Sequence, residues 1–110
     1  MVEATVRIVA PEDKRKELLD VLGSLKGPTE ATKGCQGCHV LSDVSHESIV
    51  LYVVRWNDRS AMEEHFRSER FRRLLPYIEM SLEPPQVEVN SLSRIGGLSI
   101  ILEALGISPT

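Results

Sequence analysis

Ser48-Ile-Val-Leu-Tyr-Val-Val-Arg-Trp56 is followed without a break by Asn57-Asp-Arg-Ser-Ala-Met-Glu-Glu-His-Phe-Arg-Ser-Glu-Arg-Phe-Arg-Arg-Leu-Leu75. The first half is almost entirely β-branched or aromatic, which is typical of a strand that is buried on both faces. It ends at Trp56, the only tryptophan of the chain. The second half has the composition of an amphipathic helix. We therefore expect a strand and a helix that pack directly against each other.

The start and the buried face of this helix follow from the spacing of its residues. Asn57 and Asp58 are favourable N-cap residues, and Ser60 with Glu63 has the spacing of a capping box. The helix should therefore begin within a few residues of Trp56. One face is apolar except for a histidine, and it consists of Ala61, Met62, His65 and Phe66. This spacing predicts that His65 points toward the sheet.

The remaining elements give the order strand, helix, strand, strand, helix, strand. A period-two pattern predicts a first strand over Val2–Val9, and a leucine face predicts a helix that starts near Pro11 and is interrupted by Gly27-Pro28. Further strands are expected over Gly37–Val44 and around Val87–Val89. The second helix should resume at a Ser68 cap and end or kink near Pro76. This order is the split βαβ arrangement of a ferredoxin-like α+β domain with an antiparallel sheet.

Two apolar regions of the chain, one face of the sheet and a C-terminal segment, are not covered by any other predicted element. Ile49, Leu51 and Val53 lie on the strand face opposite Val50, Tyr52 and Val54, so the sheet face away from the helices should also be apolar. A second sheet should cover it, which predicts a homodimer. Residues 1–92 form the domain, and residues 93–110 form an extension in which Gly96-Gly97 precedes a short apolar helix over Leu98–Leu105. We expect this helix to cover a cavity mouth or to clasp the partner subunit.

Composition excludes some classes of function. The formal net charge of −3 opposes binding to a nucleic-acid backbone, and the apolar segment Leu98–Leu105 is too short to span a membrane. The N-terminal residues Met1–Val9 show no charged segment followed by an apolar run, so we expect a cytoplasmic protein.

Four motifs, in this order, resemble the antibiotic biosynthesis monooxygenase (ABM) domain family over about residues 2–90. They are Lys33-Gly-Cys-Gln-Gly-Cys-His-Val40, Arg55-Trp-Asn-Asp58, Ala61-Met-Glu-Glu-His-Phe-Arg-Ser-Glu-Arg-Phe71 and Pro84-Pro-Gln-Val-Glu-Val89. The resemblance implies a dimeric α+β barrel, in which two sheets pack face to face and each subunit keeps a cavity between its sheet and its helices. It does not imply a single reaction. Members of the family include cofactor-free oxygenases of quinols or polyketide phenols, haem-degrading enzymes, and proteins without an established activity.

The haem-degrading branch fits this chain poorly. That branch carries an Asn, a Trp and a haem-ligand His where this sequence has Val6, His65 and Leu75. We therefore expect no haem, no other cofactor and no metal.

Within the resemblance, His65 is the candidate catalytic residue. A histidine near neutral pH can accept a phenolic proton, and the electron-rich anion can then react with O₂. The alternative is a half-buried histidine that only forms a structural hydrogen bond. Tyr52 and Trp56 share a strand face and are candidate substrate-binding residues, with core packing as the alternative. Tyr77 is a further candidate, as a cap on the cavity, and Arg55 is expected to form an ion pair at the dimer interface.

Cys35-Gln-Gly-Cys38-His39 matches the pattern of covalent haem attachment, but Cys38 and His39 are neighbours on a predicted strand and point to opposite faces. Zinc binding by these residues with His46 is weakly indicated, because no second CxxC pair follows. Cys35 and Cys38 remain candidate redox thiols, although we prefer to interpret Cys38 as a buried core residue and Cys35 as a semi-exposed loop thiol.

Three functions therefore remain open. The first is cofactor-independent oxygenation of a small electron-rich aromatic such as a quinol. The second is non-catalytic binding of a small molecule or a stress response by the same dimer, and the third is a redox-responsive thiol protein.

Overall fold

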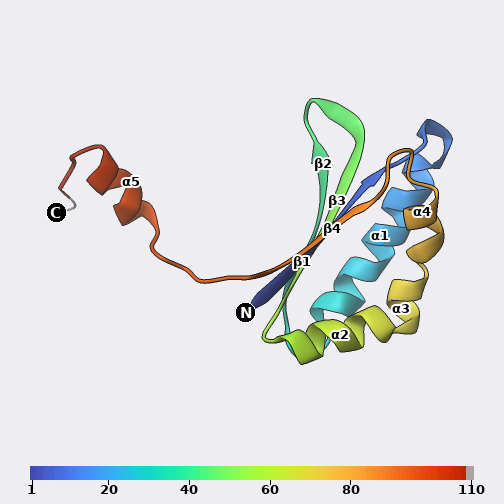
Figure 1. Ribbon diagram of the computed structural model, residues 1–110, viewed down its shortest axis with the longest axis horizontal. Helices are drawn as coiled ribbons and strands as arrows, with labels where there is room; N and C mark the ends of the chain where they lie inside the picture. Colours follow the sequence, from blue (N-terminus) through green and yellow to red (C-terminus); the bar gives the residue numbers. More distant parts are fainter. Residues whose placement is uncertain (109–110) are drawn as a thin grey trace.

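Four strands form one antiparallel sheet in the computed structural model, which describes residues 1–108 (Figure 1). The strands are β1 (Val2–Val9), β2 (Cys35–Asp43), β3 (His46–Trp56) and β4 (Gln86–Ser91), in the spatial order β2-β3-β1-β4. The whole of β1 pairs with the long strand β3, from Val2 opposite Trp56 to Val9 opposite Ile49. The expected βαββαβ ferredoxin-like fold is confirmed, with β3 in the centre of the sheet.

The helices lie together on one side of the sheet, as Figure 1 shows for α1 to α4. A 3-10 turn, η1 (Glu12–Lys14), leads into α1 (Arg15–Glu30), and the second helical region is divided into α2 (Arg59–Arg67), α3 (Glu69–Arg72) and α4 (Leu75–Glu79). No helix within residues 1–108 is both long and apolar enough to cross a membrane.

The core lies between these helices and the sheet. Alternate residues of β1 and β3 point into it, and α1 contributes every third or fourth residue. The fully buried members include Val6, Ile8, Leu18, Leu22, Leu25, Val50, Tyr52, Val54, Trp56 and Leu74. The period-two and leucine patterns therefore correctly identified the buried faces.

Two predicted boundaries are wrong. Helix α1 does not stop at Gly27-Pro28 but continues to Glu30. Proline removes one helical hydrogen bond and crowds the backbone N–H and the Cβ of the preceding residue. Gly27 has no Cβ, so part of this cost is absent at Pro28, which lies in the last turn of α1. Strand β2 begins at Cys35 rather than at Gly37, with a register shift between these two residues against β3.

On the sheet face away from the helices β3 is apolar, as predicted, whereas β1 places Thr5 and Arg7 beside Val53 and Leu51. Ile49, Leu51 and Val53 are only partly buried there, and Leu41 beside them is 49% exposed. Arg55 lies on this face, where its Nε donates to the Glu3 carboxylate of the same chain at 2.8 Å. Arg55 is thus paired with an adjacent strand of its own chain, and its expected ion pair with a partner subunit stays a prediction.

Beyond β4 the chain runs away from the domain and ends in α5 (Leu98–Ala104) (Figure 1). The predicted helix is confirmed, within one residue of its expected end. It does not cover the domain of its own chain: Leu98, Ile101 and Leu105 are 69%, 57% and 66% exposed. The last two residues of the predicted extension, 109–110, lie outside the described residues.

Candidate active site

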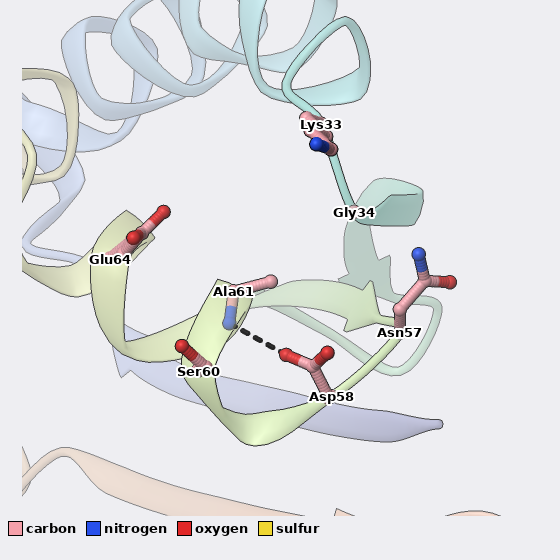
Figure 2. A pocket seen from close by; sticks show the side chains of 7 residues that line it. All are labelled: Lys33, Gly34, Asn57, Asp58, Ser60, Ala61 and Glu64. Carbon is pink, nitrogen blue, oxygen red and sulfur yellow. Dashed lines mark hydrogen bonds between the residues drawn. The ribbon is translucent and has the colours of Figure 1, made fainter.

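The position of α2 is fixed where it begins, next to the end of β3. Asp58 caps the helix, and its carboxylate accepts a hydrogen bond from the Ala61 N–H at 2.9 Å (Figure 2). Gly34, on the loop before β2, has a φ of 91°, and its carbonyl accepts a hydrogen bond from the Asn57 N–H at 2.8 Å. A Cβ at position 34 would lie 2.9 Å from the Cβ of Ala61. The loop and the helix therefore approach so closely that only glycine fits.

This placement brings His65 onto the buried side of α2, against β3. The Tyr52 hydroxyl and His65 Nε2 share a hydrogen bond of 3.1 Å. The Trp56 ring lies against the imidazole, with 5.0 Å between ring centroids. Tyr52, Trp56 and His65 are 1%, 0% and 3% exposed. Three of the four residues that the sequence suggested for the catalytic and substrate-binding site thus form one buried cluster.

Two phenylalanines complete the surroundings of the imidazole. The Phe66 and Phe71 rings have centroids 5.9 and 5.4 Å from that of His65, and they lie edge to face with each other. Phe71 is positioned by α3, whose N-cap Ser68 accepts a hydrogen bond from the Phe71 N–H. The sequence predicted the Ser68 cap, but it did not distinguish Phe71 from an ordinary core residue.

Burial controls the electrostatics of the cluster. It lowers the pKa of His65 to about 4, with a smaller contribution from the positive charge of Arg70. Burial also raises the pKa of the Tyr52 hydroxyl, and the neighbouring Cys38 thiol acts in the same direction. At neutral pH the pair is therefore a neutral phenol hydrogen-bonded to a neutral imidazole.

Three buried polar atoms at or beside this pair have no hydrogen-bond partner among residues 1–108. They are Thr29 Oγ1, Trp56 Nε1 and His65 Nδ1. Buried polar atoms are normally paired, so such a concentration marks a place where another polar group can bind. Thr29 continues the buried face of α1 one turn beyond Leu25. Its role was missed because the helix was expected to end before Pro28.

The remaining candidate site residues lie elsewhere. The Tyr77 hydroxyl on α4 bonds to the Glu17 carboxylate on α1, and burial followed by this bond raises the pKa of Tyr77. Tyr77 packs against the edge of the core rather than joining the histidine cluster.

Cys35 and Cys38 are both free thiols, and Cys35 Sγ lies 3.6 Å from the Gly37 carbonyl oxygen. Cys38 is fully buried on the helix side of the sheet, and burial raises its pKa to about 11. Its thiolate is therefore scarce at neutral pH, which opposes attack by this sulfur. Within residues 1–108, no group of three or more His, Cys, Asp and Glu side chains is arranged to hold a metal ion.

Two hollows open on the surface of the domain. One, of about 300 Å³, is lined by Lys33, Gly34, Asn57, Asp58, Ser60, Ala61 and Glu64 at the start of α2 (Figure 2). The other, of about 330 Å³, lies between β4 and α2 and is lined by Val2, Arg59, Met62, Glu63, Val89, Asn90 and Ser91. Neither is lined by Tyr52, Trp56 or His65, so the histidine cluster is closed.

The strand order and the helix layer define the class of protein as a ferredoxin-like α+β domain. The model of the family described as "Antibiotic biosynthesis monooxygenase" (ABM) matches residues 1–76, and the chain belongs to this family. No curated protein matches the sequence.

Solved structures agree on the fold. Rv0793 from Mycobacterium tuberculosis has a TM-score of 0.77 at 23% identity, covering 86% of this chain and 98% of that chain. PA3566 from Pseudomonas aeruginosa has a TM-score of 0.70 at 24% identity, with coverage of 86% and 94%. A structure described as an antibiotic biosynthesis monooxygenase has a TM-score of 0.76 at 18% identity, with coverage of 86% and 100%. At these identities the likeness concerns the fold alone.

Proposed function

We propose that this protein is a cofactor-independent monooxygenase that acts on a small electron-rich aromatic such as a quinol, with His65 as the general base. The description of its family supports oxygenation. The observation that carries the proposal is the buried hydrogen bond between Tyr52 and His65 Nε2. The other ring nitrogen of His65, Nδ1, is also buried, and it has no hydrogen-bond partner among residues 1–108.

The chemistry follows from the free nitrogen. In the tautomer whose Nε2–H donates to the Tyr52 oxygen, the lone pair of Nδ1 is available to accept a phenolic proton. The resulting quinol anion is electron-rich enough to reduce O₂. One oxygen atom enters the ring and the other leaves as water, so that a quinol and O₂ give a hydroxylated quinone and H₂O. The low pKa of His65 keeps it unprotonated before substrate binds, and the adjacent phenolate then raises that pKa by stabilising the imidazolium.

Substrate must displace part of the aromatic packing, because His65 is only 3% exposed. Phe71 belongs to the four-residue helix α3, so its ring can move more readily than that of Phe66, which lies on the longer helix α2. We propose that an aromatic substrate takes the place of the Phe71 ring against His65 and Trp56. Thr29 Oγ1 and Trp56 Nε1 would then meet the substrate's polar groups.

The test is oxygen consumption with a panel of quinols and an anthrone. We expect His65→Ala to lower kcat/KM by about 10²–10⁴-fold, the usual contribution of a general base. His46→Ala is the matched control, because His46 is an exposed histidine at the hairpin between β2 and β3. Circular dichroism checks that both variants fold. Unchanged turnover in His65→Ala would show that His65 is not the base.

Non-catalytic binding of a small aromatic is a second candidate, favoured by the closed packing around His65. Trp56 is the only tryptophan and lies against the imidazole, so its fluorescence reports occupation of the cluster. Quenching by a quinol without oxygen uptake would support binding over catalysis. The absence of both signals would contradict a site at this cluster.

We also propose that the protein is a homodimer in which the sheet faces carrying Ile49, Leu51 and Val53 pack against each other. The fold of this family is typically dimeric, and the partly exposed apolar face supports such an arrangement here. Sedimentation equilibrium should give twice the chain mass of 12.3 kDa. A monomer at micromolar concentration would contradict the dimer.

A further inference from the structure

The tail beyond β4 carries an apolar helix face that nothing in its own domain covers. Leu98, Ile101 and Leu105 follow the spacing i, i+3 and i+7 and are all more than half exposed. Ile100 points to the other side, where it packs over Gly96. Glu103 is the only charged residue of α5. The helix thus presents a narrow apolar stripe flanked by one carboxylate.

A matching surface exists on the domain, in the groove between β4 and α2. Val2, Met62 and Val89 supply its apolar lining. Arg59 and Glu63 form its charged rim, and the Arg59 side chain is 82% exposed. With about 330 Å³, the groove is large enough for several side chains. It is therefore concave, with three apolar side chains in its lining and a rim on which the exposed Arg59 guanidinium pairs with the Glu63 carboxylate at 2.7 Å.

We propose that α5 of one chain binds in the groove between β4 and α2 of a second copy of the chain. Amphipathic helices bind apolar grooves through side chains at i, i+3 and i+7, which is the spacing of the exposed stripe. The Glu103 carboxylate can then meet the partner subunit's Arg59. Because Met62 lies one turn before His65 on α2, the partner's tail packs directly on the helix that carries the proposed base. This inference rests on the proposed dimer.

The course of the tail favours a second copy over the chain's own groove. The Leu92 N–H bonds to the Met1 carbonyl oxygen, so the chain leaves β4 along the line of the sheet. It then runs away from the domain as far as α5 (Figure 1). A return to its own groove would need a reversal within residues 93–97. In a two-fold dimer both tails can reach across, so that each covers the groove of the other subunit.

The open sheet face is a poorer partner for α5. That face is broad, and it carries Glu3 and Arg55 beside its apolar centre. A second sheet covers such a surface better than a helix of seven residues does. The groove, in contrast, is bounded by a helix on one side and a strand on the other.

The first experiment measures the dimer dissociation constant of the full chain by sedimentation. We expect Ile101→Glu on the stripe and Val89→Glu in the groove each to raise this constant about tenfold or more, because each places a charge in an apolar contact. Ser99→Glu places the same charge outside the stripe. Val87→Glu places it on the same strand and the same sheet face as Val89, but outside the groove. Both controls should stay within about twofold of the unmodified chain. Equal effects of test and control variants would overturn the proposal.

The second experiment tests which groove is occupied. The double variant Val89→Cys/Ile101→Cys, made in a Cys35→Ser background, should give a covalent dimer on mild oxidation. A disulfide within one chain would place α5 in its own groove, and no disulfide would leave the tail undocked; either result overturns the proposal.

Removing the tail tests the docking of α5 separately from the proposed sheet-face dimer. A chain that ends at Arg94 should dimerise at least about tenfold more weakly. A truncated chain that dimerises as well as the full chain would contradict tail docking while leaving the sheet-face dimer intact. A monomeric full chain would contradict both.

Discussion

Leucines of the same chain have opposite environments in the domain and in the tail. Leu22 on α1 is 0% exposed, whereas Leu98 on α5 is 69% exposed. Both belong to helical patterns with apolar residues three or four apart, so the local sequence is similar. The difference is that α1 has a sheet of its own chain to cover, and α5 has none. An apolar periodicity therefore predicts a helix, but not the surface that buries it.

The comparison also separates two sources of stability. Burying a leucine side chain contributes about 1.5–3 kcal/mol. For Leu22 this contribution is present in the isolated chain. For the tail it appears only when a second surface covers the helix, so it should depend on protein concentration.

The largest expected effect comes from truncating a leucine in each region. Leu22→Ala should lower the free energy of unfolding by about 2–5 kcal/mol at every protein concentration, because it leaves a cavity in the core. Leu98→Ala should cost less than about 0.5 kcal/mol in dilute protein. Its cost should grow as the concentration rises and the proposed dimer forms. Urea denaturation at several concentrations measures both. A concentration-independent loss of several kcal/mol in Leu98→Ala would show that the tail packs within its own chain.

A second prediction concerns pH and the buried histidine. The pKa of His65 is lowered from 6.5 to about 4 in the folded protein, so between these values the unfolded chain binds more protons at this residue. Stability from this group is therefore complete above pH 6.5 and is lost as the pH falls toward 4. The full loss amounts to about 3 kcal/mol.

His65→Gln should remove this part of the pH dependence, measured as the difference in unfolding free energy between pH 7 and pH 4.5. A chain truncated after Arg94 should keep it, because the tail does not contact the cluster. If His65→Gln and the unmodified chain lose the same stability on acidification, His65 titrates normally in the folded state and its burial has been misjudged.

The sequence was most informative where local pattern and packing agree. Within the run from Ser48 to Trp56 both faces of the strand are largely apolar, so its central place in the sheet could be predicted. Asp58 and Ser68 are capping residues, and both cap helices as expected. The juxtaposition of His65 with Tyr52 also follows from these rules. A strand that leads directly into a helix leaves little freedom in how the two faces meet.

Other features depend on contacts that local patterns do not encode. The passage of α1 through Pro28 is eased by the missing Cβ of Gly27, and it puts Thr29 on the buried face of the helix. The placement of Phe71 depends on the break between α2 and α3. The absence of an open cavity at His65 is decided by how several aromatic rings pack together. Each of these is a tertiary property of residues far apart in the chain.

The smallest expected effects come from two glycines that are crowded in different ways. A Cβ at Gly34 would meet the Ala61 Cβ at 2.9 Å, and the φ of 91° disfavours any L side chain. Gly34→Ala should therefore cost about 1–3 kcal/mol of unfolding free energy. A Cβ at Gly96 would lie even closer to a neighbour, 2.4 Å from the Ile100 Cδ1. That atom ends an exposed side chain which can rotate into solvent, so Gly96→Ala should cost less than about 0.5 kcal/mol.

The two substitutions are the same, but the sites differ in backbone conformation and in whether the neighbouring atom can move. Thermal and urea denaturation of the two variants measure the difference. Equal costs would mean that the tail is as firmly packed as the domain, which would require α5 to be held by its own chain. A larger cost in Gly34→Ala that is unaffected by protein concentration would place the rigid contact in the domain and leave α5 free to bind a second copy.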